Sequence, residues 1–176
     1  HPGRINYASS GVGSGGFLAA ELLKKMAHIQ MTHIPYKGPG PALVDLVAGQ
    51  VDLLFTSPLA ALPHVLSQRL RAVAVTSSTR AIELPDIPTV AEQGFAGYEV
   101  HSWWGVVAPA GVPPAILKKL DGALRDVLAQ PETRNRLQQL GATVRALPAE
   151  PFENYIAQEM ALWGKVVRDS KISATE

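Results

Sequence analysis

Short apolar runs alternate with helix-like patterns along the first half of the chain. Four segments have the pattern of a strand: 5–8, 31–36, 51–55 and 70–76. Apolar side chains at a 3.6-residue spacing predict helices between them, over 17–26, 42–48 and 59–67. Because strand and helix alternate, we expect an α/β fold with a mostly parallel sheet and flanking helices.

The pattern changes after Thr76, where loops and longer helices take over. We expect a short helix over 89–93, an extended segment over 98–107, helices over 112–129, 131–141 and 151–169, and a strand over 142–147. The helix over 112–129 has an apolar stripe of Ile116, Leu117, Leu120, Leu124 and Leu128. This stripe needs a partner, which is either the first α/β block or a sheet outside this chain.

Composition removes several classes of protein. The 176 residues are 47% hydrophobic, which favours a packed core. Sixteen basic and fifteen acidic residues give a net charge of +1, which argues against a nucleic-acid partner. The chain has no cysteine, and its five histidines lack metal-ligand spacing, so we expect neither disulfides nor a metal site. No run is long enough to span a membrane and no signal peptide is visible, so we expect a soluble chain.

The glycine-rich turn "SSGVGSGG" lies between the first strand and the first helix, and it permits three interpretations. Gly11, Gly13 and Gly16 match the G-x-G-x-x-G pattern of a dinucleotide site. That site needs an acidic residue after the second strand, where this chain has Lys37. A second interpretation is an anion site, in which the helix N-terminus and the hydroxyls of nearby serines replace water. The third is a tight turn with only a helix cap.

Two more strand ends carry similar loops, which favours the anion site. "YKGPGP" follows the second strand, and "FTSPLA" follows the third, where Thr56 and Ser57 are candidate helix caps before Pro58. In an open α/β sheet such strand ends line the ligand crevice.

Several motifs resemble one known family over essentially the whole chain. The blocks are "INYASSGVGSGG", "THIPYKGPGPALVDLVAGQVDLLF", "LPDIPTVAEQGFAGYE", "WGVVAPAGVP" and "WGKVV". Together they resemble the periplasmic receptors of tripartite tricarboxylate transporters, the Bug receptors.

The resemblance implies a type II periplasmic binding-protein fold, in which two lobes close around a small organic acid. It implies that residues 1–103 form the complete second lobe, and that 104–176 return to a first lobe lacking roughly the N-terminal third of a receptor. It further implies a periplasmic, non-enzymatic protein without a cofactor, which binds a small carboxylate and delivers it to the membrane permease subunits of the transporter.

Site residues follow from the same resemblance. The serine- and glycine-lined turn corresponds to a carboxylate loop, with these donors: Ser9, Ser10, Gly11, Gly13 and Ser14. Tyr36 and Lys37 correspond to residues in the wall of the cleft. Thr56 and Ser57 stand where the family commonly has Asp-Asn, which leaves the ligand open. Two other functions are a nucleotide-dependent enzyme that uses the glycine turn, and an assembly module that no longer binds ligand and forms a homodimer through exposed helices.

Overall fold

The computed structural model describes residues 3–139, 142–169 and 172, and the chain divides into two compact units. Unit 1 comprises His1–Ser102 with Trp163–Glu176, and unit 2 comprises Trp103–Leu162. We describe each unit by itself. The predicted correspondence of 1–103 and 104–176 to two lobes stays a prediction.

Unit 1 contains a three-stranded parallel sheet. Its strands are β1 (Asn6–Ser9), β2 (Thr32–Pro35) and β3 (Leu53–Leu54), in the order β2-β1-β3. Tyr7 pairs with His33 on one side and with Leu53 on the other. The first three predicted strands are therefore confirmed: β1 has the predicted length and begins one residue later, whereas β2 and β3 are shorter than predicted.

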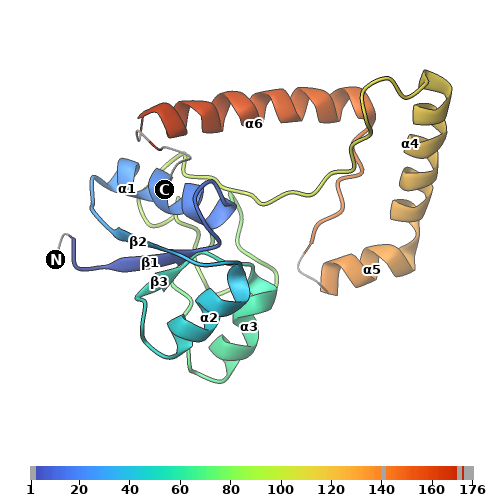
Figure 1. Cartoon of the computed structure of the whole chain (residues 1–176). Helices are drawn as coiled ribbons and strands as arrows, with labels where there is room; N and C mark the ends of the chain where they lie inside the picture. The colour runs from blue at the N-terminus through green and yellow to red at the C-terminus, as the bar shows by residue number, and fades with distance from the viewer. Residues whose placement is uncertain (1–2, 140–141, 170–171, 173–176) are drawn as a thin grey trace. The chain divides into compact units, whose positions relative to one another are not determined.

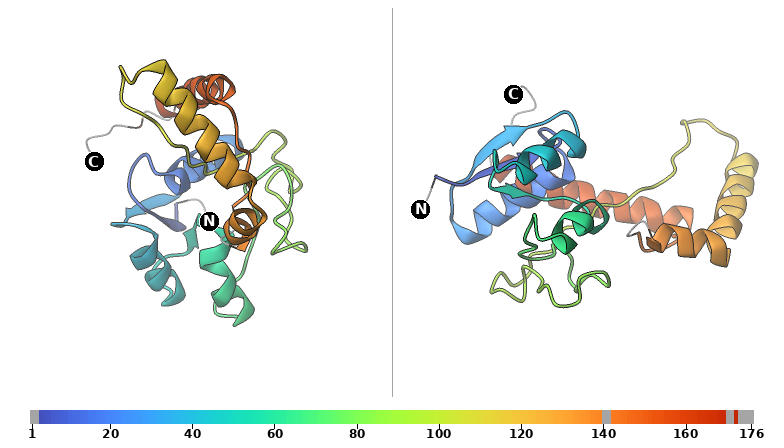
Figure 2. Two further views of the ribbon diagram at one scale, coloured as in Figure 1. Left: turned by 90° about the vertical axis from the view of Figure 1, so that its right-hand side faces the viewer. Right: turned by 90° about the horizontal axis from the view of Figure 1, so that it is seen from below.

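Helices cover both faces of this sheet, as Figure 1 and Figure 2 show. Between and after the strands lie α1 (Gly15–Ala27), α2 (Pro39–Val47) and α3 (Pro58–Leu66). Successive β1 residues point to opposite faces. Tyr7 is buried in a cluster with Phe17 and Ala20 of α1, whereas Ala8 is buried with Ala42 of α2. The helix–sheet–helix layering predicted from the alternating pattern is confirmed.

Two predicted elements of unit 1 were wrong. Residues 70–76 form no strand, because among the described residues their backbone makes only an isolated bridge, Val75 with Thr89, and one bond to Val100 instead of a ladder. Val75 N–H donates to Pro88 O (2.9 Å). Val90 N–H donates to Val75 O (2.9 Å), and Val100 N–H donates to Thr76 O (2.9 Å). Residues 89–93 form turns instead of a helix. There Thr89 and Glu92 cap each other, since each backbone N–H donates to the other's side chain at 2.7 and 3.0 Å.

The end of α6 (Ala149–Asp169) belongs to unit 1. Trp163 is partly buried and packs against the cluster around buried Ala19 and Tyr98. Asp169 forms an ion pair with Lys25 of α1, and this pair lowers the pKa of the Asp169 carboxyl. The last turns of α6 are thus held against α1.

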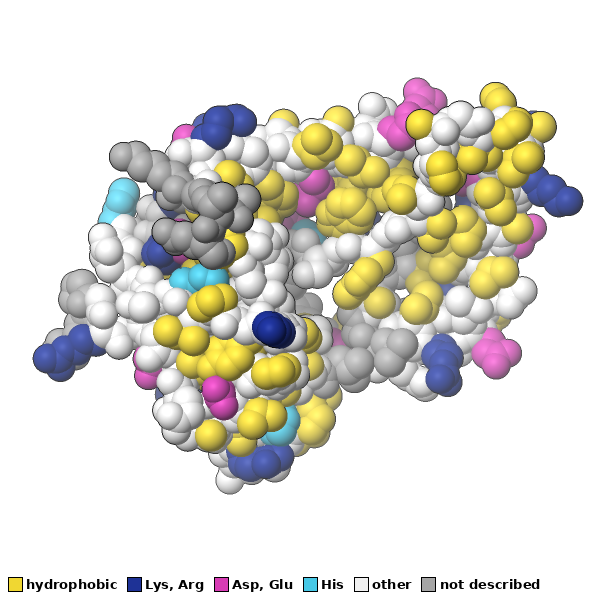
Figure 3. Space-filling model, viewed as in Figure 1, with side chains coloured by type: hydrophobic (Ala, Val, Ile, Leu, Met, Phe, Trp, Pro, Cys, Tyr) yellow, Lys and Arg dark blue, Asp and Glu magenta, His cyan; other side chains and the backbone are white. Residues whose placement is uncertain are grey.

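Unit 2 contains α4 (Pro114–Ala129), α5 (Pro131–Gln139) and the first part of α6. All three predicted helices are confirmed, although the expected stop of the second at Gly141 lies outside the described residues. The predicted strand over 142–147 was wrong, because the described part of unit 2 offers no strand to pair with it. Most of the predicted stripe on α4 is exposed, and Figure 3 shows hydrophobic side chains gathered over this helix. The exposed members are Ile116, Leu117, Leu120 and Leu124. Leu128 is half-buried, and its neighbour Val127, which was not predicted, is exposed.

The two adjacent tryptophans of unit 2 have different environments. Trp103 packs edge-on against Phe152 and Tyr155, with ring centroids 5.6 and 5.7 Å away, and its Nε1 donates to Glu159. Trp104 is 81% exposed. Trp103 is itself 40% exposed, so neither ring is buried in a core.

Candidate functional site

The glycine turn joins β1 to α1 and owes its shape to its sequence. Gly11 (φ 112°) and Gly13 (φ 79°) both lie in the region of positive φ, which residues with a side chain rarely adopt. Ser14 is the N-cap of α1 and accepts a hydrogen bond from Phe17 N–H at 3.4 Å. The cap interpretation of this turn is therefore correct, and it is compatible with a binding role.

Gly16 serves a different purpose, because it lets α1 approach β3 closely. A Cβ at Gly16 would lie only 2.7 Å from the carbonyl oxygen of Phe55. A Cβ on Gly15 would lie 3.3 Å from Ser102 Oγ. Ser102 therefore borders the start of α1, and sequence reasoning missed it because it lies 87 positions along the chain from Gly15.

Most amides of the turn have no acceptor within the described residues. Gly11 N–H donates to Ser9 Oγ (3.1 Å), and Ser14 N–H donates to Gly11 O (3.2 Å). Five neighbouring N–H groups make no hydrogen bond within the described part of the chain: those of Ser10, Val12, Gly13, Gly15 and Gly16. Ser10, Gly13 and Gly15 are exposed. The turn therefore presents N–H donors at the positive end of α1, which suits an anion.

Ser9 differs from the other serines, because its side chain points into the protein. It is 1% exposed, and its hydroxyl oxygen lies 2.7 Å from His33 Nε2. Its predicted role as a direct ligand donor stays a prediction. In this structure the Ser9 hydroxyl contacts the turn by accepting a hydrogen bond from Gly11 N–H.

Tyr36 and Lys37 lie at the end of β2, beside the turn. Tyr36 N–H donates to Ser9 O (2.9 Å), and its hydroxyl donates to Asp45 Oδ2 (2.8 Å). The bond to Asp45 raises the pKa of the Tyr36 hydroxyl. Lys37 is exposed and forms no ion pair with any described residue. Its ammonium group is therefore available to a bound anion.

Thr56 and Ser57 follow β3 on the other side. Ser57 caps α3 by accepting from Ala60 N–H at 3.4 Å, and Pro58 occupies the first turn, as predicted. Since β1 is the central strand, the turn after it lies between the other two loops at one edge of the sheet. The topology thus brings the three predicted loops together, although contact of these residues with a ligand stays a prediction.

Sequence reasoning also missed a polar network between β1 and α1. The Tyr7 hydroxyl donates to Glu21 Oε1 (2.8 Å), and Lys24 Nζ lies 2.6 Å from the same oxygen. Burial, followed by the bond to Glu21, raises the pKa of Tyr7. Glu21 lies on the buried side of α1. The 3.6-residue pattern cannot show that its carboxylate has hydrogen-bond and ion-pair partners there. No group of three or more metal-ligating side chains occurs among the described residues.

Comparison with known proteins identifies the family. The model of the tripartite tricarboxylate transporter family receptor matches residues 1–172. A protein of the tcbD–tcbE intergenic region of a Pseudomonas species is 35% identical over all of this chain and 53% of its own length. Protein BugT of Bordetella pertussis is 34% identical over 96% of this chain and 52% of its own length. The chain spans about half the length of these relatives.

Solved structures agree with this family. A Rhodopseudomonas palustris protein with adipate has a TM-score of 0.89 and 34% identity, over 98% of this chain and 58% of that one. The periplasmic binding protein BugD has a TM-score of 0.86 and 33% identity over the same shares. MatC of the same Rhodopseudomonas species, with bound malate, has a TM-score of 0.82 and 34% identity, over 94% of this chain and 57% of that one.

These matches confirm the type II periplasmic binding-protein fold and the resemblance found in the motifs. The chain belongs to the tripartite tricarboxylate transporter receptor family, the family of the Bug proteins.

Proposed function

We propose that this chain is part of a periplasmic receptor that binds a small organic acid. One observation carries the proposal: the exposed turn at the start of α1 offers several N–H groups without acceptors among the described residues. A carboxylate accepts hydrogen bonds from such donors in place of water, and charge assistance strengthens them. The relatives solved with adipate and malate support a ligand of this class.

We assign the turn the main role in holding the carboxylate. Ser10 and Ser14 supply hydroxyls around the free amides, and Lys37 supplies a positive charge. Tyr36, fixed by Asp45, forms one wall. Thr56 and Ser57 face the ligand from the next loop and contribute to its selection. No general base or nucleophile is required, so we propose binding without catalysis.

The receptor would deliver its ligand to membrane permease subunits of a tripartite tricarboxylate transporter. Membership of the receptor family supports this partner. A periplasmic location fits the BugD likeness. Within the described residues, every helix is too short or too polar to cross a bilayer.

Calorimetry with a panel of mono- and dicarboxylates tests the binding function. The experiment uses the 176-residue chain and, if the gene encodes more, its full product. We expect heat of binding for at least one dicarboxylate of four to six carbons and none for NADP(H). Binding of NADP(H) with no response to any carboxylate would instead favour the nucleotide-dependent enzyme. The glycine pattern of such an enzyme is present, but Lys37 stands where its acidic residue is expected.

A further inference from the structure

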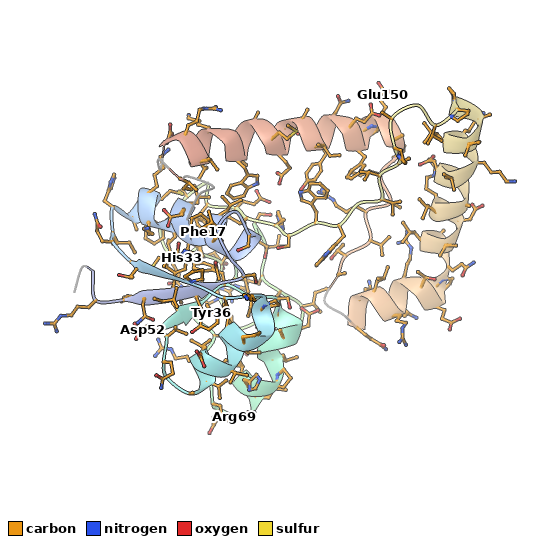
Figure 4. All side chains as sticks on the ribbon, in the orientation of Figure 1. Phe17, His33, Tyr36, Asp52, Arg69 and Glu150 are labelled. Carbon is orange, nitrogen blue, oxygen red and sulfur yellow. The ribbon has the colours of Figure 1, made fainter. Side chains whose placement is uncertain are left out.

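His33 of β2 lies inside the layer between the sheet and α1. Its ring stacks on Tyr7 with centroids 5.0 Å apart, and Phe17 lies 4.7 Å away on the helix side. Figure 4 shows Phe17 and His33 next to each other. An imidazole in this half-buried position needs a hydrogen-bond partner, because a polar group removed from water is unfavourable without one.

The partner of His33 is the hydroxyl of Ser9. Nε2 and Oγ are 2.7 Å apart. The same Oγ accepts from Gly11 N–H and lies 3.1 Å from Gly11 O. Gly11 O in turn accepts from the N–H of Ser14, and Ser14 is the N-cap residue of α1. A continuous chain of hydrogen bonds therefore leads from His33 in β2 to the peptide that starts the ligand turn.

Burial favours the neutral form of the His33 ring. Burial lowers the pKa of His33, the Glu21 carboxylate opposes this shift, and the Lys24 ammonium adds to it with a smaller effect. Tyr7 stays protonated, since burial and Glu21 raise its pKa. Either tautomer of the neutral imidazole keeps this chain of bonds: Nε2 accepts the Ser9 proton, or an Nε2–H donates to Oγ and the hydroxyl donates to Gly11 O. In both cases Oγ accepts from Gly11 N–H.

We infer that His33 and Ser9 are positioning residues of the ligand turn: the imidazole fixes the Ser9 hydroxyl, and that hydroxyl fixes the Gly11 peptide. The free amides of Val12 and Gly13 follow this peptide directly, so its orientation sets where they point. The effect on ligand affinity rests on the proposed function, but the effect on the turn does not.

Four variants test the inference. His33→Phe keeps an aromatic ring against Tyr7 and Phe17 but removes the bond to Ser9. His33→Gln keeps a polar group able to reach Ser9, and Ser9→Ala removes the hydroxyl itself. Thr32→Ala, an exposed neighbour in β2, is the matched control.

The first readout is hydrogen exchange of the Gly11 amide by NMR without ligand. We expect exchange about tenfold faster in His33→Phe and Ser9→Ala, and wild-type rates in His33→Gln and Thr32→Ala. Wild-type exchange in both bond-deleting variants would overturn the inference, as would equal acceleration in Thr32→Ala or no rescue by His33→Gln. If His33→Phe does not fold, Ser9→Ala and His33→Gln carry the comparison.

The second readout is affinity for adipate and malate by calorimetry. We expect about tenfold weaker binding in the two bond-deleting variants, with recovery in His33→Gln. Unchanged affinity alongside faster Gly11 exchange would overturn the link between the turn's anchoring and binding. If the wild type binds neither acid, the proposed function fails for these ligands, and the exchange comparison still decides whether His33 and Ser9 hold the turn.

Discussion

At the scale of single residues, the ligand turn depends on backbone angles that only glycine adopts at low cost. Gly13 has a φ of 79°, and a Cβ there would meet nothing within 4 Å. Its requirement for glycine is therefore conformational and not steric. The sequence reveals such positions well, because a glycine cluster between a strand and a helix is typical of a tight turn with positive φ angles.

Gly13→Ala should lower the free energy of unfolding by about 1–2 kcal/mol, since a side chain in the positive-φ region is strained. Gly122→Ala is the matched control: Gly122 lies in α4 without positive φ, and its Cβ site is also empty. We expect that control to keep or slightly raise stability. Urea denaturation measures both, and equal effects would contradict a conformational requirement at Gly13.

The second prediction for residues concerns the serines of the turn. Ser14 caps α1, whereas Ser10 is exposed and has no hydrogen-bond partner among the described residues. Ser14→Ala should therefore cost about 1 kcal/mol of stability. Ser10→Ala should leave stability unchanged and weaken only carboxylate binding. Thermal unfolding with and without ligand separates the two effects. A Ser10→Ala chain that is destabilised without ligand would contradict the purely ligand-binding role of Ser10.

At the scale of elements, the close approach of α1 to Phe55, directly after β3, positions the turn. Gly16 allows this approach, as its Cβ site lies 2.7 Å from the Phe55 carbonyl oxygen. Gly16→Ala should destabilise unit 1 by about 1–3 kcal/mol, because backbone must move to admit the methyl group. Gly122→Ala in α4, where nothing lies within 4 Å, should instead stabilise its helix by up to about 1 kcal/mol. Calorimetric unfolding of both variants checks the contrast, and a stabilised Gly16→Ala chain would refute it.

A pH-dependent element is the turn over 89–93. Hydrogen bonds from Arg80, followed by the bond from Thr89 N–H, lower the pKa of the Glu92 carboxyl. A lowered pKa means that Glu92 contributes stability above its unfolded pKa, near 4.5, and loses it as the pH falls through the lower folded value. Glu92→Gln should therefore reduce the loss of stability below about pH 4.5. Melting curves between pH 7 and 3 test this, and identical slopes would contradict it.

The sequence predicts elements well where local pattern decides, and poorly where a distant partner decides. The six longer predicted helices are confirmed because their apolar spacing and caps are local, as at Ser14 and Ser57, whereas the short helix predicted over 89–93 was wrong. Strands 70–76 and 142–147 failed because a strand needs a neighbouring strand, which local pattern cannot reveal. The three loops of the site were foreseen from strand ends. His33, Glu21 and Ser102 were not, because their partners lie far along the chain.

At the scale of the whole molecule, unit 2 leaves a helix face without a cover among the described residues. Leu120 is 50% exposed on α4, in a stripe of exposed apolar side chains. Such a stripe favours association. We therefore expect the 176-residue chain to show a concentration-dependent mass by light scattering, as the homodimer proposal requires. Leu120→Glu should reduce it, and Lys119→Gln on the same helix should not. A monomer at all concentrations would contradict the homodimer.

The central claim is that free amides of the glycine turn hold a carboxylate. Amide NMR shifts of the chain, titrated with adipate and with malate to tens of millimolar, test it most directly. The account predicts the largest shifts at Ser10, Val12, Gly13, Gly15 and Gly16, with little change at amides already bonded within the fold, such as Val90. Saturable shifts elsewhere with these amides unmoved, or no shift at any of them with either acid, would contradict it.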